Sequence, residues 1–290
     1  MINVCGVCKE IEGTKILNDI NLNIKEGSIL GLIGPNGAGK TTLIKILTGV
    51  WQEDLGTVKY DDMPVFDNKE VKKRIGYVPD FCNYYESFKV REIIEFYKLA
   101  YDKFDEKRFD EINSTLQISK SKRISSLSKG NKAKLMLALN LSIYPEFLMM
   151  DEPTSGLDPV AKRKFVEIIL DEVSARKTTV LISTHNLADV EQICDSIAII
   201  NSGEIQYDGS VDAIKQKVTK LQVIFKNGFT REAFGDEILE VKNVGSVYYI
   251  IVKDYSEKFE EKLKEHGASL VEEVDLSLEE IFVYSYGKGV

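Results

Sequence analysis

Hydrophobic residues in the first 80 positions fall into short runs separated by turn-forming residues. Gly13 and the pair Glu26-Gly27 mark two of these turns. Such runs predict β-strands, whereas the spacing of apolar positions after residue 41 predicts a helix. The predicted strands cover residues 2–7, 15–24, 29–33, 56–60 and 73–79, and the predicted helix begins at about residue 42.

The period of the pattern changes between about residues 84 and 144. Apolar side chains recur at helical spacing at Val90, Ile93, Ile94 and Tyr97, and again from Leu135 onward. Charged residues fill many of the positions between them, which is typical of a solvated helix face. We therefore predict a helical insertion, at about residues 84–145, between two sets of strands.

Strand-like runs return after the insertion. Runs at residues 147–150 and 178–183 flank a predicted helix at 160–175, and runs at 196–200 and 204–207 predict a hairpin. Beyond about residue 214, further short strands and two helices follow. The pattern predicts two domains, at residues 1–214 and 215–290, of which the second is a small α+β domain of about 75 residues.

The composition is that of a globular chain with an acidic balance. The chain has 290 residues, 43% hydrophobic content and a formal net charge of −8. This charge disfavours nucleic-acid binding by phosphate neutralisation. The apolar stretches fall short of the ~18 residues of a membrane span, and the first residues lack the basic and apolar regions of a signal peptide. We therefore expect a cytosolic chain.

A glycine-rich stretch joins the strand at 29–33 to the helix after it. Lys40 and Thr41 directly follow glycines at the spacing of a phosphate-binding loop. Glycines let successive N–H groups point into one concave surface, and the helix N-terminus adds positive charge. Lys40 would reach the β- and γ-phosphates, and the Thr41 hydroxyl would bind Mg²⁺. The candidate nucleotide-binding residues are Gly34, Pro35, Asn36, Gly37, Ala38, Gly39, Lys40, Thr41 and Thr42.

Two carboxylates supply the partners that a phosphate-binding loop needs. Asp151 and Glu152 follow the buried strand at 147–150, at the edge where open α/β sheets bind ligands. We predict that Asp151 holds Mg²⁺, directly or through water, and that Glu152 polarises the attacking water. Alone, the glycine stretch could be a turn that binds nothing, and the acidic pair could be an ordinary strand end. Together they predict a nucleotide site.

Over roughly residues 1–210 the chain resembles the ATPase subunit of an ABC transporter. Its further motifs stand in the family's order: the Q-loop at 77–80, the signature motif at 127–131, the second carboxylate motif with the D-loop at 152–158, and the switch histidine at 183–185. The resemblance implies an α/β P-loop NTPase fold. This fold has a RecA-like core sheet, an antiparallel β subdomain and a helical insertion, and here the small α+β domain follows it.

The resemblance also implies a site shared by two subunits that meet head to tail, as a homodimer or a heterodimer. Ser128 and the Gly130 N–H of one subunit would contact the γ-phosphate held by the other, and Asp158 would line the seam. His185 would hydrogen-bond the γ-phosphate and act in catalysis with Glu152. The implied cofactors are ATP and Mg²⁺, and the implied reaction is hydrolysis of ATP to ADP and phosphate.

Several positions depart from the family pattern. Lys129 and Asn131 stand in the signature motif where many relatives have Gly and Gln. Asp80 replaces the usual Gln of the Q-loop, and we predict that it coordinates Mg²⁺ through water. Ile11 stands where relatives place an adenine-stacking aromatic residue, which predicts weaker and less selective nucleotide binding.

Two classes of function fit such a chain. The favoured hypothesis is an ATPase docked on separate transmembrane permease subunits at the inner face of the cell membrane. It would reach the membrane only through these partners, whose cytoplasmic helix would enter a groove near Asp80 and residues 84–86, and it would drive export of drugs, peptides or lipid-linked molecules. The alternative is a soluble ABC-type ATPase that acts on nucleic acid or ribosomes. The acidic charge disfavours this alternative, so we expect no direct nucleic-acid partner.

Overall fold

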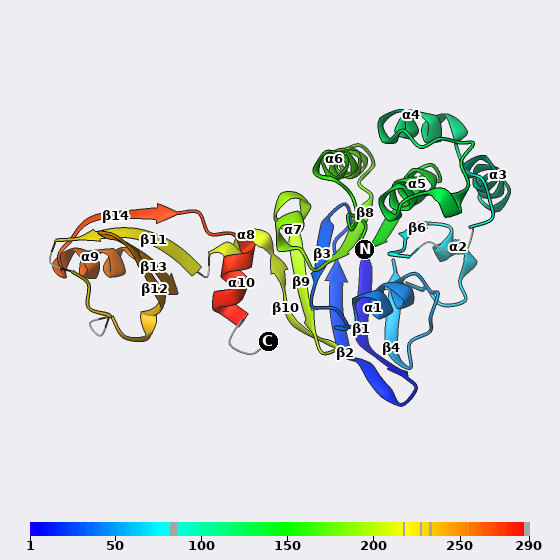
Figure 1. Ribbon diagram of the computed structural model, residues 1–290. Helices are drawn as coiled ribbons and strands as arrows, with labels where there is room; N and C mark the ends of the chain where they lie inside the picture. The colour runs from blue at the N-terminus through cyan, green and yellow to red at the C-terminus, as the bar shows by residue number, and fades with distance from the viewer. Residues whose placement is uncertain (82–85, 217, 227, 232–233, 254, 287–290) are drawn as a thin grey trace. The chain divides into compact units, whose positions relative to one another are not determined.

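The computed structural model describes residues 1–81, 86–216, 218–226, 228–231, 234–253 and 255–286 (Figure 1). The chain forms two compact units, Met1–Asp208 and Gly209–Val290. The predicted start of the helical insertion, at about residue 84, lies outside the described residues. The domain boundary after residue 214 stays a prediction.

A six-stranded sheet forms the centre of the first unit. Its strand order is β10 (Glu204–Ser210), β9 (Ser196–Asn201), β3 (Ile29–Ile33), β8 (Thr179–Thr184), β7 (Phe147–Asp151) and β6 (Ile75–Val78). Every residue of β3, β7 and β8 is buried, as expected of parallel strands that are covered on both faces. These strands run parallel, with Asp151 beside Ser183 and Ile33 beside Thr184. Their carboxyl ends therefore meet at one edge.

A four-stranded antiparallel sheet packs next to this core. Its order is β2 (Thr14–Ile24), β1 (Ile2–Ile11), β4 (Leu55–Tyr60) and β5 (Met63–Pro64). Helix α1 (Lys40–Leu47) shares one buried hydrophobic cluster with strands of both sheets, and Leu43, Ile44 and Leu47 of α1 are completely buried in it. This cluster fixes the start of α1 against the edge of the central sheet. The short helix α2 (Lys69–Lys72) precedes β6.

The helical insertion lies between β6 and β7, and Figure 1 shows its helices gathered at one end of the unit. Asn140 ties it to the central sheet, because its buried side-chain amide accepts from the Tyr77 N–H and donates to the Tyr77 carbonyl, both at 3.0 Å. Beyond β7, one helix connects β7 to β8 and another connects β8 to β9. The five helices are α3 (Val90–Ala100), α4 (Glu106–Leu116), α5 (Lys129–Leu141), α6 (Pro159–Arg176) and α7 (Leu187–Ile193).

The second unit contains an antiparallel sheet and a helix that shares its core. The sheet order is β12 (Ile238–Val244), β13 (Val247–Lys253), β11 (Val218–Phe225) and β14 (Ala268–Val274). Phe259 and Leu263 of α9 (Glu257–Glu265) are buried in the same cluster as Leu221 and Ile250. The helices α8 (Val211–Lys215) and α10 (Leu278–Tyr286) begin and end this unit. The predicted fold class, an α/β P-loop fold followed by a small α+β domain, is confirmed.

Candidate functional site

The glycine loop connects β3 to α1 at the carboxyl edge of the central sheet. Gly39, directly before α1, has a φ of 107°, a conformation that favours glycine. A Cβ on Gly34 would lie only 2.2 Å from the Ile200 carbonyl oxygen, so the loop passes β9 more closely than any other residue type allows. The loop therefore turns tightly around the N-terminus of α1, an arrangement that suits phosphate binding.

Lys40 is buried against the loop and is only 6% exposed. Its Nζ donates to the carbonyl oxygens of Gly34 at 2.6 Å and Pro35 at 3.2 Å, and lies 3.6 Å from Glu152 Oε1. These oxygens hold the ammonium group in place. The loop thus carries a fixed positive charge beside the helix N-terminus, and both features attract an anion.

The buried Asp151 side chain is hydrogen-bonded to Thr41 and to the buried Ser183. Thr41 Oγ1 donates to Asp151 Oδ2 at 2.7 Å, and Ser183 Oγ donates to Asp151 Oδ1 at 2.6 Å. The second contact follows from the parallel register of β7 and β8, and no motif in the sequence predicts this role for Ser183.

Thr41 and Asp151 supply the hard oxygen ligands that suit Mg²⁺, which usually binds one or two carboxylates together with substrate phosphates. Within the described ranges, no group of three or more His, Cys, Asp or Glu side chains could hold a metal ion by itself. The two side chains therefore fit a Mg²⁺ ion that shares the oxygens of a nucleotide.

Glu152 and His185 form a pair at the same edge. His185 Nδ1 lies 2.9 Å from Glu152 Oε2, so the ring donates to the carboxylate when Nδ1 carries the proton. The Glu152 backbone has a φ of 47°, and its N–H donates to Ser183. Glu152 Oε1 is buried without a hydrogen-bond partner. An acceptor held in this way can bind and orient a water molecule.

A cavity of about 300 Å³ lies between the glycine loop and the carboxylates. Its lining includes Asp80 together with loop residues and Glu152, and the metal role of Asp80 stays a prediction. Ile16 and Pro35 supply its apolar side chains, and no sequence motif pointed to Ile16. Ile11 lies at the end of β1 opposite Thr14, and its contact with a base stays a prediction. The cavity is lined by Ile16, Pro35, Asn36, Gly37, Gly39, Lys40, Thr41, Thr42, Asp80 and Glu152.

The signature residues lie beside the loop at 152–158, and they are not among the residues that line this cavity. Ser128 caps α5 and accepts a hydrogen bond from the Asn131 N–H at 3.3 Å. Gly130 packs so closely that a Cβ there would lie 2.6 Å from the Gly156 carbonyl oxygen. Asp158 caps α6, and the hydrogen bond from the Ala161 N–H lowers the pKa of its carboxyl group. These groups therefore lie outside the lining of the chain's own phosphate cavity.

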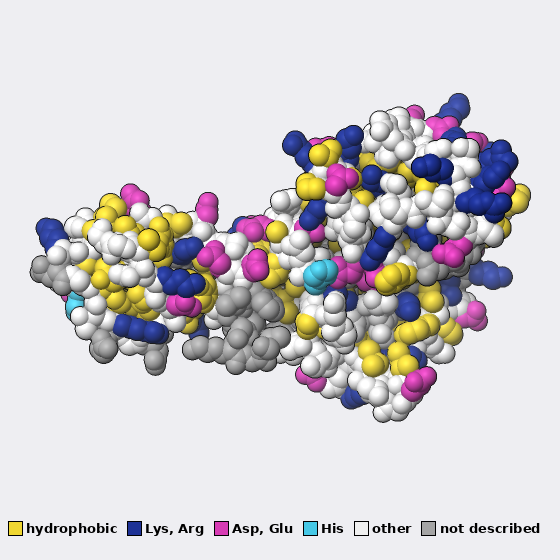
Figure 2. Space-filling model, in the orientation of Figure 1, with side chains coloured by type: hydrophobic (Ala, Val, Ile, Leu, Met, Phe, Trp, Pro, Cys, Tyr) yellow, Lys and Arg dark blue, Asp and Glu magenta, His cyan; other side chains and the backbone are white. Residues whose placement is uncertain are grey.

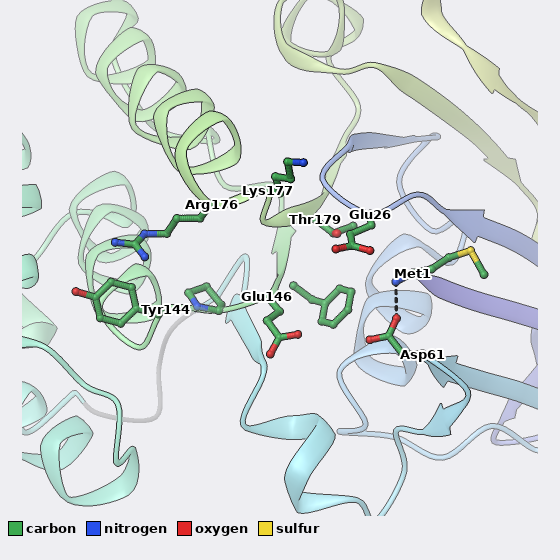
Figure 3. A pocket seen from close by; sticks show the side chains of 10 residues that line it. Met1, Glu26, Asp61, Tyr144, Glu146, Arg176, Lys177 and Thr179 are labelled. Carbon is green, nitrogen blue, oxygen red and sulfur yellow. Dashed lines mark hydrogen bonds and ion pairs between the residues drawn. The ribbon is translucent and has the colours of Figure 1, made fainter.

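Another cavity, of about 350 Å³, lies at the amino ends of β7 and β8 (Figure 3). The Arg176 guanidinium stacks 4.3 Å from the centre of the Tyr144 ring, and the Met1 amino group pairs with Asp61 at 2.7 Å. Ligands of open α/β sheets bind at the carboxyl ends of the strands. This cavity lies at the other edge of the sheet and is therefore the weaker candidate.

Comparisons with known proteins give the same assignment as the site. A family model described as ABC transporter matches residues 17–155. The Nod factor export ATP-binding protein I of Bradyrhizobium diazoefficiens is 34% identical over 219 residues, which are 73% of this chain and 71% of that protein. The chain belongs to the ABC transporter family. Within that family it is an ATP-binding and ATP-hydrolysing subunit, as the sequence predicted.

Other relatives of this ABC ATPase extend the likeness. The ABC transporter ATP-binding protein YtrB of Bacillus subtilis is 29% identical over 99% of this chain and 98% of its own length, so the similarity includes the second unit. The bacitracin transport ATP-binding protein BcrA of Bacillus licheniformis is 31% identical over 76% of this chain and 73% of its own. A solved ATP-binding subunit of an ABC transporter matches with a TM-score of 0.68 at 27% identity, over 74% of this chain and 92% of that chain.

The two sides of the cavity have different tasks in this ABC ATPase. Lys40 and the N-terminus of α1 offset the negative charge of the bound phosphates. The Glu152 carboxylate contacts His185 and is able to accept a hydrogen bond from a water molecule, which the prediction that Glu152 orients the attacking water requires. Mg²⁺, held by Thr41 and Asp151, would supply further charge neutralisation when it is bound.

Proposed function

We propose that this ABC ATPase dimerises around two ATP molecules, with Mg²⁺, and drives export by separate transmembrane subunits. The observation that carries the proposal is the position of Ser128 and Gly130. Both lie outside the lining of the chain's own phosphate cavity, although Ser128 caps a 13-residue helix whose N-terminus suits a phosphate. A second subunit, identical or different, would bring its own phosphates to that helix.

Export is supported by the names of the relatives. Two of them are named for Nod factor export and bacitracin transport. No helix within the described ranges has the length and apolar character to cross a membrane. We therefore place the chain at the inner face of the cell membrane, in contact with the bilayer only through its partner subunits.

The alternative, an ATPase that acts on nucleic acid or ribosomes, would need a surface that neutralises phosphates. Figure 2 shows Lys and Arg side chains over the helical insertion with acidic side chains among them. Several of these cations are already paired, such as Lys98 with Glu95 at 3.1 Å. An ion-paired surface releases few counterions when it meets a polyanion, so we expect no direct nucleic-acid partner.

Co-purification tests the proposal. The Glu152→Gln variant, with ATP present to hold the dimer closed, would be purified from native membranes beside the Lys40→Ala variant, which lacks the phosphate-binding cation. We expect the first variant to retain a membrane protein with about six apolar spans of ~20 residues each. Recovery with ribosomes or nucleic acid, and without such a protein, would favour the alternative.

A further inference from the structure

Lys129 and Asp80, two of the residues that depart from the family pattern, meet in the structure. They lie far apart in sequence, yet the Lys129 ammonium forms an ion pair with the Asp80 carboxylate. The same Nζ donates to Ser155 Oγ at 3.1 Å and lies 4.8 Å from the centre of the Phe81 ring. One cation of the signature motif thus contacts the Q-loop and the D-loop of its own chain.

Asp80 also faces the nucleotide site. Its carboxylate lines the phosphate cavity together with Lys40 and Glu152. Lys40 already lies 3.6 Å from Glu152, and Asp151 adds a further buried carboxylate. Without Lys129, the cavity lining would carry two carboxylates and one ammonium group, and the Asp151 carboxylate is hydrogen-bonded to Thr41 of the same lining. Because the Asp80 side chain is only 23% exposed, solvent screens its charge less than it screens that of a surface residue.

We propose that Lys129 is a positioning residue that neutralises Asp80 and holds it at the rim of the phosphate cavity. Nucleotide affinity then depends on the two residues as a unit. An Asp at the Q-loop position repels the triphosphate unless a cation stands beside it, and a Lys at this signature position supplies that cation. The contact with Ser155 adds a link from the pair to the loop that carries Glu152.

The pair predicts a specific pattern of nucleotide affinities. Lys129→Met keeps the apolar stem over Phe81 but leaves Asp80 as an unpaired anion, so it weakens ATP binding. Mg²⁺ offsets part of the phosphate charge, and the loss is therefore larger for Mg²⁺-free ATP. Asp80→Asn removes the negative charge. In that background, Lys129→Met leaves no unpaired anion and should change ATP affinity little.

Calorimetric titration of the full chain with ATP in EDTA, and then with Mg²⁺, tests this cycle of four proteins. We expect Lys129→Met to weaken binding of Mg²⁺-free ATP on the order of tenfold in the wild-type background and by less than about twofold in the Asp80→Asn background. Lys129→Arg keeps the cation and should bind as wild type does. Thermal unfolding of each variant reports whether it folds, and Lys129→Gln serves if the Met variant does not.

Equal losses in both backgrounds would overturn the proposal, because Lys129 would then act without Asp80. So would a Lys129→Arg variant that binds as weakly as Lys129→Met. A wild-type chain that fails to bind ATP would instead contradict the nucleotide site itself. The two failures are therefore distinguishable in the same titrations.

Discussion

Glu152 combines a left-handed backbone with a partly unsatisfied carboxylate. Its φ is 47°, a conformation that costs free energy in a residue with a Cβ and that concentrates at functional sites. One carboxylate oxygen contacts His185, whereas the other is buried without a hydrogen-bond partner. The free-energy cost of burying this oxygen falls when a water molecule donates a hydrogen bond to it. A water molecule bound there would be held as the hydrolysis reaction requires.

Glu152→Gln tests this reading directly. The amide retains the size of the side chain but loses the negative charge, so we expect kcat for ATP hydrolysis to fall by about two orders of magnitude or more. ATP affinity should remain, because Lys40 and the glycine loop are unchanged. Steady-state ATPase rates and equilibrium binding measure the two effects. Glu167→Gln, on the exposed face of α6, is the matched control, and equal rates in both variants would remove Glu152 from catalysis.

At the scale of elements, the N-terminus of α5 packs against the loop that follows β7. Gly130 is buried there, and Lys129 contacts Ser155 in the same loop. The loop that carries Glu152 and the signature residues are therefore parts of one packed contact. A shift of α5 should therefore move the loop that carries Glu152, and with it the signature residues Ser128 and Gly130 that we propose face a partner.

Gly130→Ala should disturb this contact. A Cβ would lie 2.6 Å from the Gly156 carbonyl oxygen, and backbone at such a distance must move. We expect a loss of about 1–3 kcal/mol in the free energy of unfolding, as overpacked sites show, together with a lower ATPase rate. Urea unfolding and steady-state kinetics measure these changes. Asn131→Ala, at the next position of α5, should be close to neutral. A Gly130→Ala variant as stable and active as this control would contradict the contact.

At the scale of the whole molecule, each unit encloses its own hydrophobic core. The core residues of the first unit come from both of its sheets and its helices, and those of the second come from β11, β12, β13 and α9, together with Phe234. The nucleotide site lies entirely within the first unit. A ligand that binds one unit stabilises that unit by mass action.

Calorimetry should therefore show two unfolding transitions, of which nucleotide shifts one. ADP at about 100 times its Kd stabilises the binding unit by about 2.7 kcal/mol, which corresponds to a rise of about 5–10 °C in its Tm. The transition of the unit at 209–290 should stay in place. Lys40→Ala, which loses the cation of the loop, should abolish the shift. A single transition that moves as a whole would mean that the units unfold together.

Much of the site could be predicted from the sequence because its chemistry lies in short segments. The glycine loop and His185 each follow a buried strand, and the pair Asp151-Glu152 stands at the end of another. Parallel strands bring their carboxyl ends to one edge, and the structure places these segments there. The predicted helix at 160–175 also matches α6, because Asp158 caps it and Pro159 begins it. Helix α4 could not be predicted from the apolar pattern, because most of its residues are polar or charged and its buried side chains are only Phe109 and Leu116.

By itself, the sequence determined the fold class and the ATPase family, and it predicted the phosphate loop and the carboxylate that we assign to catalysis, since each depends on local pattern. Only the tertiary structure decided which distant side chains meet. The β1–β2 register contains several shifts, and Ile16 lines the cavity. The approach of α5 to the Q-loop pairs Lys129 with Asp80. Register and helix packing are set by the fit of whole elements to one another, and no local pattern encodes that fit.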